Sequence, residues 1–323
     1  MYDFDIKNKM NNETFQDAFY VKEFKADVAR NKKEFANILL MNKNGTYMSK
    51  LWDLTEEKKM VLEKAKLILV KGTINEYLGN KQIIINNFKV DDGSKVDIKH
   101  LVKTSETDID EIMNFVNNTV DNFENNTIKL ITKEILDKYS YEFRYVGGAK
   151  TNHHNYYSGL AEHTYNILLD CMDVSKRYKN INYDLLFAGA ILHDIGKIKE
   201  FVYDSETGIV SDYTREGELI GHLVMGSQEV ALAEQKLLLD GEEIDHKMVV
   251  NLQHLILSHH GKLEYGSPKL PSMPEADILS KMDSLDCYQE MFTTVIGEIP
   301  DDQEFSSRQY ALDGRKITSS EFW

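Results

Sequence analysis

The chain has 323 residues, 42% of them hydrophobic, which is enough apolar material for a sizeable core and favours about two domains. The formal net charge of −15 argues at first sight against a nucleic-acid partner, but residues 1–100 carry 18 Lys and Arg against 15 Asp and Glu, so the acidic excess lies in the rest of the chain. The polar N-terminus and the lack of a long apolar run predict no signal peptide, no transmembrane helix, no membrane partner and a cytoplasmic location. Cys171 and Cys287 match no zinc or redox spacing and are predicted to be reduced core thiols.

Short runs rich in aliphatic and aromatic residues fill residues 18–92, after an N-terminal extension at residues 1–17. They predict the strands Val21–Ala29, Phe35–Met41, Tyr47–Trp52, Ala65–Val70 and Gln82–Val90. Turn residues separate these runs, and Leu54–Glu63 has the pattern of a helix. Five short strands with one helical insert suit a small closed barrel of the oligonucleotide-binding (OB) type, although periodicity alone equally allows another small β-domain.

Helical patterns dominate the chain after a predicted boundary turn at Asp91–Ser94. Residues 93–149 are predicted as a helical linker, with breaks near Asn117–Asn118 and Asn125–Asn126 because asparagine is a poor helix former. Residues 150–300 are predicted as an all-α domain and residues 301–323 as a polar tail. The predicted fold class is therefore a multidomain α and β protein, in which a small N-terminal OB-like β-barrel is followed by an all-α domain.

The dipeptide His193-Asp194 follows a fully apolar helical run, and Gly196 is expected to end that helix. An imidazole nitrogen and a carboxylate oxygen side by side at a helix end can both reach one cation. His-Asp dipeptides arise by chance in many proteins, so the apolar setting gives this one its weight. Burying such a pair is costly unless something compensates for it, and a metal ion would do so.

Further residues of metal-ligating types lie on neighbouring predicted helices. They are His163, His222, His259, His260 and Asp283, with Asp286 one helical turn beyond Asp283. Together with His193-Asp194 they supply four ligands for one metal and about three for a second, with Asp194 shared. Each alone has a structural alternative: His222 as an ordinary histidine, His259-His260 as a helix C-cap, and Asp283 as a solvent-facing carboxylate. Their joint occurrence in one helical domain favours a metal centre.

The order His163, His193-Asp194 and Asp283 resembles the HD-domain metal-dependent phosphohydrolase superfamily, and the added histidines resemble its two-metal members. The closer resemblance is to the bacterial YhaM-type 3′-to-5′ exoribonucleases, which join an OB fold to an HD domain. The matching stretches are Lys50–Asp53, Thr151–His154, Ser158–His163, Ala190–Lys197, Gly217–His222, Leu257–Lys262, Gly266–Lys269 and Tyr310–Gly314. The likeness is highly specific in the HD half and loose in the front domain.

This resemblance implies an assignment of ligands to two metals. His163, His193, Asp194 and Asp283 would hold the first, and Asp194, His222, His259 and His260 the second. The implied activity is hydrolysis of single-stranded RNA, or also DNA, from the 3′ end to nucleoside 5′-monophosphates, and a homo-oligomer is compatible with it. Mixed histidine and carboxylate ligands favour manganese, with cobalt, iron or magnesium as alternatives.

Substrate contacts are predicted from side-chain chemistry. Lys197 is expected to neutralise the substrate phosphate, with a plain surface lysine as the alternative, and His153 and His154 to orient the substrate. Aromatic rings can stack unpaired bases without reading sequence. The candidates in the front domain are Tyr47, Trp52, Tyr77 and Phe88, of which at least two are expected to fill the barrel core instead. Trp52 and Tyr77 are the predicted stacking residues.

Two other functions remain open from the sequence. One is an HD hydrolase of a small nucleotide, such as a deoxynucleoside triphosphate, an alarmone or a cyclic dinucleotide; the front barrel argues against it, because a mononucleotide needs no strand-holding module. The other is a non-enzymatic nucleic-acid-binding regulatory protein whose metals serve only the fold. The full ligand set argues against this second alternative.

Overall fold

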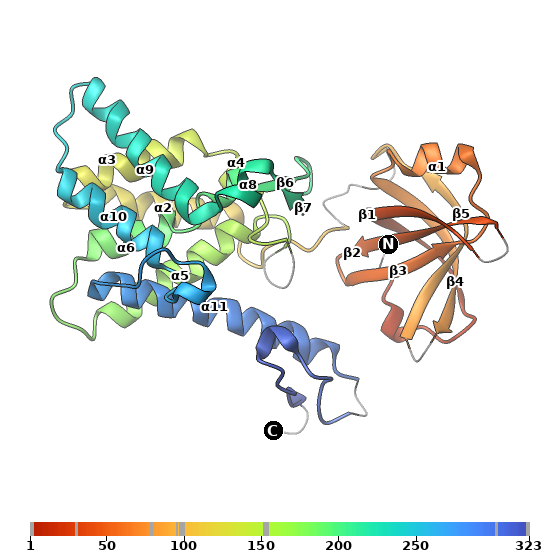
Figure 1. Ribbon diagram of the computed structural model, residues 1–323. Coiled ribbons are helices and arrows are strands. Elements are labelled where there is room, and N and C mark those ends of the chain that lie inside the picture. The colour runs from red at the N-terminus through yellow and green to blue at the C-terminus, as the bar shows by residue number, and fades with distance from the viewer. Residues whose placement is uncertain are drawn as a thin grey trace. The chain divides into compact units, whose positions relative to one another are not determined.

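The computed structural model describes residues 3–29, 32–77, 80–94, 96, 101–150, 155–300 and 303–320. The chain divides into two compact units, Met1–Thr104 and Ser105–Trp323. The front unit is built mainly of strands and the second mainly of helices (Figure 1). The predicted fold class, a β-barrel followed by a helical domain, is therefore confirmed.

A closed barrel with the strand order β1-β2-β3-β5-β4 forms the front unit. Its elements are β1 (Thr14–Val28), β2 (Glu34–Asn42), β3 (Gly45–Leu51), α1 (Glu56–Leu62), β4 (Leu67–Tyr77) and β5 (Asn80–Val90). Neighbouring strands are antiparallel except β3 and β5, which run parallel with Ser49 opposite Ile83. Side chains that alternate along the strands fill the interior, so that Ile38, Leu40 and Ile68 are fully buried.

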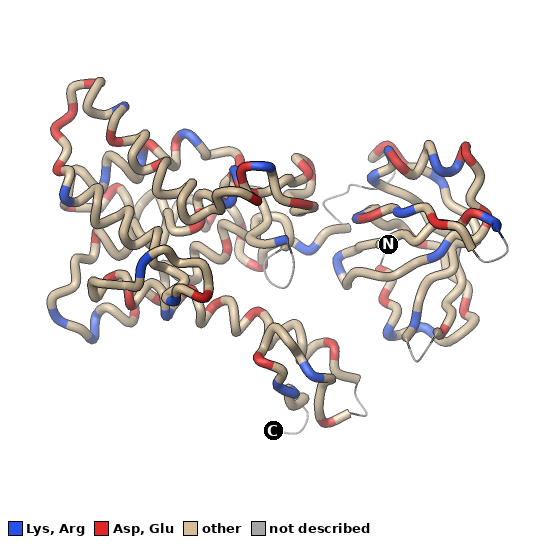
Figure 2. The backbone as a smooth tube through the Cα atoms, viewed as in Figure 1, with Lys and Arg blue, Asp and Glu red and all other residues tan. Residues whose placement is uncertain are grey.

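The N-terminal stretch contributes to this barrel rather than preceding it. Strand β1 begins at Thr14, inside the segment predicted as an extension. The short 3-10 helix η1 (Ile6–Asn8) comes before it, and the ring of Phe4 packs into the barrel core at 3% exposure. Lysines and carboxylates are mixed along the strands of the barrel (Figure 2), in keeping with the near balance of charge in the front of the chain.

Helix α6 (Tyr183–Leu192) lies at the centre of the second unit, where it contacts α3, α5, α10 and α11. The helices of this unit are α2 (Ile109–Asp121), α3 (Asn126–Lys138), α4 (Glu142–Tyr145), α5 (Gly159–Ser175), α7 (Lys197–Glu200), α8 (Arg215–Leu219), α9 (His222–Leu239), α10 (His246–Ser258) and α11 (Pro274–Glu298), with 3-10 turns η3 (Leu263–Tyr265) and η4 (Tyr310–Leu312). A helix that is apolar on all sides must be buried, and α6 is such a helix. Its C-terminal end therefore places His193 and Asp194 in the interior of the unit. Within the described ranges, no helix is long and apolar enough to cross a membrane.

Helices α2 and α3 arise from the stretch predicted as a linker. They pack into the main core of the second unit, where Ile112 and Ile131 are fully buried. The two compact units meet at Thr104 and Ser105, whereas the sequence predicts boundaries after residues 92 and 149. By their packing, these two helices therefore belong to the same unit as the helices that carry the predicted metal ligands.

Helix α2 runs without a break through Asn117 and Asn118, so the break expected there is wrong. Val116 and Val120 are buried on either side of these residues, and this packing outweighs the poor helix propensity of asparagine. Asn125 lies in a true break, where it caps α3 by accepting a hydrogen bond from a backbone N–H in its first turn.

One further feature differs from the helical pattern predicted for the second unit. The hairpin of β6 (Phe201–Tyr203) and β7 (Val210–Tyr213) interrupts the helices between residues 200 and 214. The described part of the tail folds onto the end of α11, where Leu312 and Ile317 pack with Val295. Short strands and a small satellite core leave only a weak trace in the sequence.

A buried carboxylate links α9 to α3 and α7. Glu229 is 2% exposed and accepts hydrogen bonds from Lys138 Nζ (2.5 Å) and Lys199 Nζ (2.6 Å). Burial would raise the pKa of Glu229, but the two ammonium groups hold that pKa below its usual value. Helix α7 begins three residues after Asp194. The hydrogen bonds to Glu229 therefore fix the segment that follows the predicted metal ligands.

We expect Glu229→Gln to lower the free energy of unfolding by about 2 kcal/mol at pH 7, because hydrogen bonds to charged groups contribute about 1.5–3 kcal/mol. The pKa of Glu229 is lower in the folded chain than in the unfolded chain. The stabilisation is therefore present above the unfolded pKa of about 4.3 and is lost as the pH falls through the folded pKa. Urea denaturation at pH 7 and pH 4 measures both effects, with the exposed Glu242→Gln as control. If the difference in free energy of unfolding between the variant and the wild type does not narrow at low pH, the stabilisation by Glu229 is not ionic.

Candidate metal centre

The predicted metal ligands converge in one cluster inside the second unit. His163 lies on α5, His193 and Asp194 follow α6, His222 begins α9, His259 and His260 follow α10, and Asp283 lies on α11. Ligand atoms of His163, His193 and Asp194 lie within 4.8 Å of one another, as do those of His222, His259 and His260. The structure thus brings together every described residue that the sequence predicts as a metal ligand.

Asp194 lies between two groups of histidines and turns one oxygen towards each. Its Oδ2 lies 3.5 Å from His163 Nε2 and 3.3 Å from His193 Nε2. Its Oδ1 lies 3.5 Å from His222 Nε2 and 3.6 Å from His259 Nε2. Such a carboxylate can bridge two cations, one on each side.

Each histidine of the cluster is held by its Nδ1 atom, so that Nε2 points inward. His193 Nδ1 lies 2.8 Å from the Ala190 carbonyl oxygen, and His259 Nδ1 lies 2.8 Å from that of Ile256. His260 Nδ1 is 2.8 Å from the Tyr265 carbonyl oxygen. A carbonyl oxygen only accepts hydrogen bonds, so Nδ1 carries the proton in these three rings and the lone pair of the neutral ring is on Nε2.

Two carboxylates that the sequence analysis did not assign hold the remaining rings. His163 donates from Nδ1 to Asp286 Oδ2 at 2.6 Å, and Asp286 Oδ1 also accepts from Asn166 at 3.0 Å. Glu200 Oε1 accepts from both the backbone N–H and the Nδ1 of His222, each at 2.9 Å. The position of Asp286, one helical turn after Asp283, was a sequence signal for the role of Asp286. No sequence pattern pairs Glu200 with a histidine that lies 22 residues further along the chain.

Gly196 allows helix α9 to reach the cluster. A Cβ atom at this position would lie 2.2 Å from the His222 carbonyl oxygen and 2.8 Å from the Gly226 nitrogen. Any larger residue would therefore push the first turn of α9, and His222 with it, away from Asp194. The prediction that Gly196 ends the helix is wrong, because α6 already ends at Leu192 and Gly196 precedes α7; its role in the structure is to permit this close approach.

The geometry of the cluster fits divalent cations. Asp194 Oδ1 is buried and accepts no hydrogen bond from the described part of the chain. His222 Nε2 and His260 Nε2 lie 3.2 Å apart, and His163 Nε2 and His193 Nε2 lie 3.3 Å apart. Lone pairs of neutral rings that face one another at this distance repel unless a cation or a proton lies between them. An unpaired buried oxygen between converging imidazoles is what a bound metal ion would satisfy.

The charges around the cluster set the protonation of its members. Burial alone would lower the pKa of His163, but Asp194, Asp283 and Asp286 raise it well above its usual value. Burial would raise the pKa of Asp194, yet the Lys197 ammonium, with Nζ 2.5 Å from Oδ2, and His193 hold it well below its usual value. Burial lowers the pKa of His259 to about 3.

Cys287 also lies against the cluster, although the sequence suggests only a core thiol. Its Sγ lies 3.7 Å from Asp283 Oδ1, and these two residues form a third close group with His163. Burial raises the pKa of Cys287 to about 12, so the thiol is neutral and donates a weak hydrogen bond to the carboxylate. Both cysteines are free thiols, as predicted.

The predicted stacking residues of the front unit are exposed. Trp52 is 49% exposed and stacks on Phe35 with ring centroids 5.1 Å apart, while Lys50 Nζ lies 5.1 Å from the Trp52 ring. Tyr77 is 63% exposed. Tyr47 is buried, and Phe88 packs against the barrel core, in line with the expectation that two of the candidates fill it. His153 and His154 lie outside the described residues.

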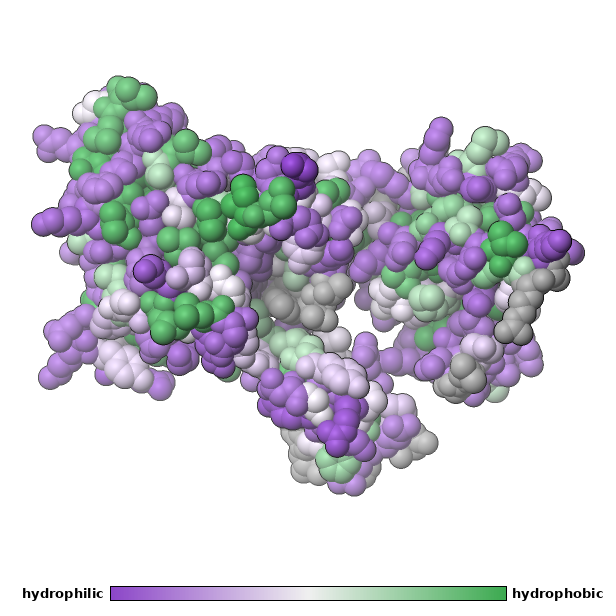
Figure 3. Space-filling model, viewed as in Figure 1, coloured by the Kyte–Doolittle hydropathy of each residue, from purple (hydrophilic) through white to green (hydrophobic). Residues whose placement is uncertain are grey.

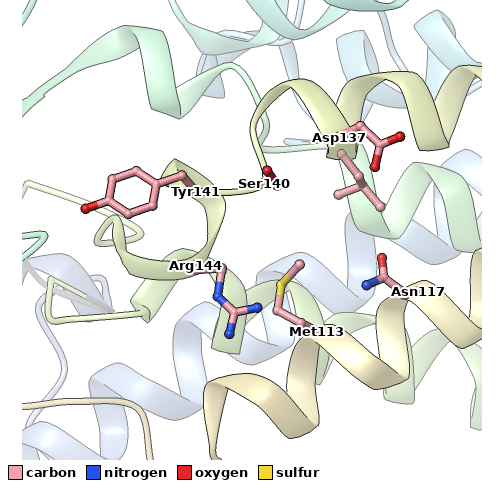
Figure 4. A pocket seen from close by; sticks show the side chains of 7 residues that line it. Met113, Asn117, Asp137, Ser140, Tyr141 and Arg144 are labelled. Atoms are coloured by element: carbon pink, nitrogen blue, oxygen red, sulfur yellow. The ribbon is translucent and has the colours of Figure 1, made fainter.

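A separate cavity of about 310 Å³ lies beside α2, α3 and α4 (Figure 4). Its lining residues are Met113, Asn117, Leu136, Asp137, Ser140, Tyr141 and Arg144. The Arg144 guanidinium is hydrogen-bonded to Asp110, and none of the lining residues belongs to the metal cluster. This cavity is therefore distinct from the candidate metal centre.

Comparisons with known proteins identify a family model, relatives and a solved structure to which this chain is similar. Residues 160–287 match the family model described as HD domain. The chain is 36% identical over 299 residues to the protein named 3′-5′ exoribonuclease YhaM of Bacillus licheniformis, covering 92% of each chain. It is 34% identical over 304 residues to the protein of that name from Bacillus subtilis, covering 94% of this chain and 93% of that one. The second OB-fold domain of replication protein A from Methanococcus maripaludis has 17% identity and a TM-score of 0.24, over 28% of this chain and 96% of that domain.

Asp286→Ala should weaken metal binding without unfolding the chain. Carboxylates that orient a metal-ligating histidine typically contribute about 10- to 100-fold to metal affinity, and we expect a loss in that range. Titration calorimetry with Mn²⁺ measures it. Asp277→Ala is the matched control, because Asp277 is an exposed carboxylate on the same helix. Unchanged Mn²⁺ affinity in Asp286→Ala would refute the orienting role of this carboxylate.

Proposed function

This chain belongs to the family of YhaM 3′-5′ exoribonucleases, and we propose that its cluster of histidines and aspartates is the metal centre of that activity. The chain is a metal-dependent enzyme that hydrolyses RNA from the 3′ end. The observation that carries the assignment of the site is the position of Asp194, which turns one buried oxygen towards each of two histidine groups. This arrangement suits phosphodiester hydrolysis, in which charge develops on both the attacking and the leaving oxygen.

The two groups correspond to two proposed metal sites. The first consists of His163, His193, Asp194 and Asp283, and the second of Asp194, His222, His259 and His260. When bound, divalent ions supply positive charge that stabilises the transition state and lowers the pKa of water. Manganese is the ion we propose, because mixed histidine and carboxylate ligands suit it, with cobalt, iron and magnesium as alternatives.

The protein's own side chains prepare this site before substrate arrives. Because their Nδ1 atoms are held by carbonyls and carboxylates, the rings need no reorientation to present Nε2, and such preorganisation favours electrostatic stabilisation. Lys197 is 11% exposed and lies against Asp194 Oδ2. We propose that its ammonium also contacts a non-bridging oxygen of the scissile phosphate. The products would be nucleoside 5′-monophosphates.

The front barrel is proposed to hold the upstream part of a single-stranded substrate. The chain binds single-stranded nucleic acid, and RNA is the proposed substrate, with DNA as a second proposed substrate. The stacked Phe35 and Trp52 rings with Lys50 beside them combine aromatic faces with positive charge, the combination that binds unpaired strands without reading sequence. Tyr77 is a second proposed stacking residue, and His153 and His154 are proposed to orient the substrate. A cytoplasmic location and a homo-oligomer also remain proposals.

Asp194→Ala tests the metal centre. With a 5′-labelled single-stranded RNA and Mn²⁺, we expect the wild type to give a ladder that shortens from the 3′ end. The variant should lose activity by about 1000-fold or more, because removal of a residue on which the whole site depends has effects of at least this size. Circular dichroism and RNA affinity serve as controls for folding. Intact RNA with the wild type under every divalent metal would exclude the proposed activity.

Trp52→Ala tests the barrel. A stacked base contributes about 1–3 kcal/mol, so we expect the KM for a long RNA to rise about 10-fold while kcat stays the same. Met60→Ala is the control, since Met60 is exposed on the same unit but lies on α1. Equal KM values for the wild type and both variants would show that Trp52 does not contact the substrate.

A further inference from the structure

Exposure differs among the residues of the metal centre, and the side chains of Asp283 and Lys197 are each 11% exposed. The side chains of His163, His193 and His259 are at most 1% exposed. The side chain of His222 is 12% exposed, and His260 is partly exposed as well. The accessible opening of the cluster therefore includes His222 and His260, and the residues beside these two histidines are candidates for contact with the end of a strand.

The turn η3 adjoins this opening through a direct contact with His260. The carbonyl oxygen of Tyr265 accepts the hydrogen bond from His260 Nδ1 at 2.8 Å. Gly261, which lies between them in sequence, has φ +76°, and a Cβ there would lie 2.2 Å from Ser280 Oγ on α11. The loop is thus pressed against the helix that carries Asp283, and its position relative to the cluster is fixed.

Two side chains of this loop, those of Lys262 and Tyr265, are exposed to solvent. The ring of Tyr265 is 52% exposed. Lys262 Nζ lies 3.2 Å from the Tyr265 hydroxyl oxygen and 4.6 Å from the ring centroid. Among the residues that the structure describes, no carboxylate forms an ion pair with Lys262, so its charge is available to a phosphate. Leu219 and Ile220, which precede His222 in the sequence, are exposed as well. Figure 3 shows hydrophobic patches on the surface of the second unit.

We propose that Lys262 and Tyr265 form the subsite for the 3′-terminal nucleotide. The Tyr265 ring stacks on the terminal base, and the Lys262 ammonium binds a phosphate oxygen of the same end. The proposal rests on the exonuclease function, and it assigns the recognition of the terminal base to residues next to the metal ligands. Stacking suits this task, because an enzyme that removes every nucleotide in turn must bind all four bases at the same place.

A purely structural role for the pair leads to different expectations. If Tyr265 only fixed the loop, and through its carbonyl the ring of His260, its loss would lower Mn²⁺ affinity and slow every substrate equally. If the ring stacks on the terminal base, its loss affects only substrates that have such a base. The two roles are therefore separable by a substrate pair that differs in nothing else.

The experiment compares the first cleavage of two 5′-labelled RNAs, identical except that one lacks the base of its 3′-terminal nucleotide. In the wild type we expect kcat/KM to be about 10-fold higher with the base, which corresponds to one stacking contact. Tyr265→Ala should bring this ratio to about 1, Tyr265→Phe should keep it, and Tyr178→Ala, which removes an equally exposed tyrosine at the end of α5, should leave it unchanged. Lys262→Gln should lower kcat/KM for both RNAs and reduce its dependence on salt, since one phosphate contact is lost.

Each other outcome is informative. A wild type that cleaves neither RNA would overturn the exonuclease function itself. A wild type that cleaves both RNAs equally, or a Tyr265→Ala variant that keeps the 10-fold ratio, would overturn the subsite while the exonuclease function stands. Equal slowing of both RNAs by Tyr265→Ala, together with weaker Mn²⁺ binding in calorimetry, would show that the residue acts only on His260 and would also overturn it.

Discussion

The burial of one carboxylate is the constraint on which the second unit depends. Asp194 is 2% exposed, and an ionised group in such a place is costly unless positive charge and hydrogen-bond donors surround it. Lys197 and His193 keep its pKa low, while Oδ1 is left without a hydrogen-bond donor among the described residues. The helices around it bring imidazole rings towards this carboxylate from several directions, and a bound cation would satisfy the unpaired oxygen.

Two helix ends of this unit orient histidines of the candidate metal centre. The last carbonyl groups of any α-helix have no partner within the helix. At the ends of α6 and α10, the carbonyls of Ala190 and Ile256 accept the Nδ1 hydrogens of His193 and His259, so each ring satisfies an orphan acceptor and turns Nε2 to the centre. A histidine directly after an apolar helix is thus oriented by the helix itself. This is a physical reason why the same pattern occurs twice around one site.

This pattern also explains how much of the site could be predicted from the sequence. Residue type and position after an apolar run were enough to single out His193 and His259, because the local helix determines their orientation. The partner of His222 was not predictable, since Glu200 reaches it only through the packing of α7 against α9, which in turn requires Gly196. For the same reason, helix α2 continues through two asparagines whose propensity predicts a break. Contacts between segments that are distant in the sequence determine these features, and such contacts are difficult to infer from a single sequence.

The charge of the chain determines how it can hold its substrate. Residues 101–323 carry 20 Lys and Arg against 38 Asp and Glu, so most of the second unit repels phosphates, and a broad basic surface cannot supply the affinity. The remaining sources of affinity are the local positive charge of the proposed metal ions and a few aromatic side chains with a lysine beside them. Lys50 lies 5.1 Å from the Trp52 ring, and Lys262 lies 4.6 Å from the Tyr265 ring. In the proposed binding mode, each pair provides an aromatic ring on which a base stacks and a positive charge that binds a phosphate, without hydrogen bonds that would favour one base. An exonuclease that must advance through any sequence requires this kind of contact, since a site that read each base would stall wherever its hydrogen bonds were not met.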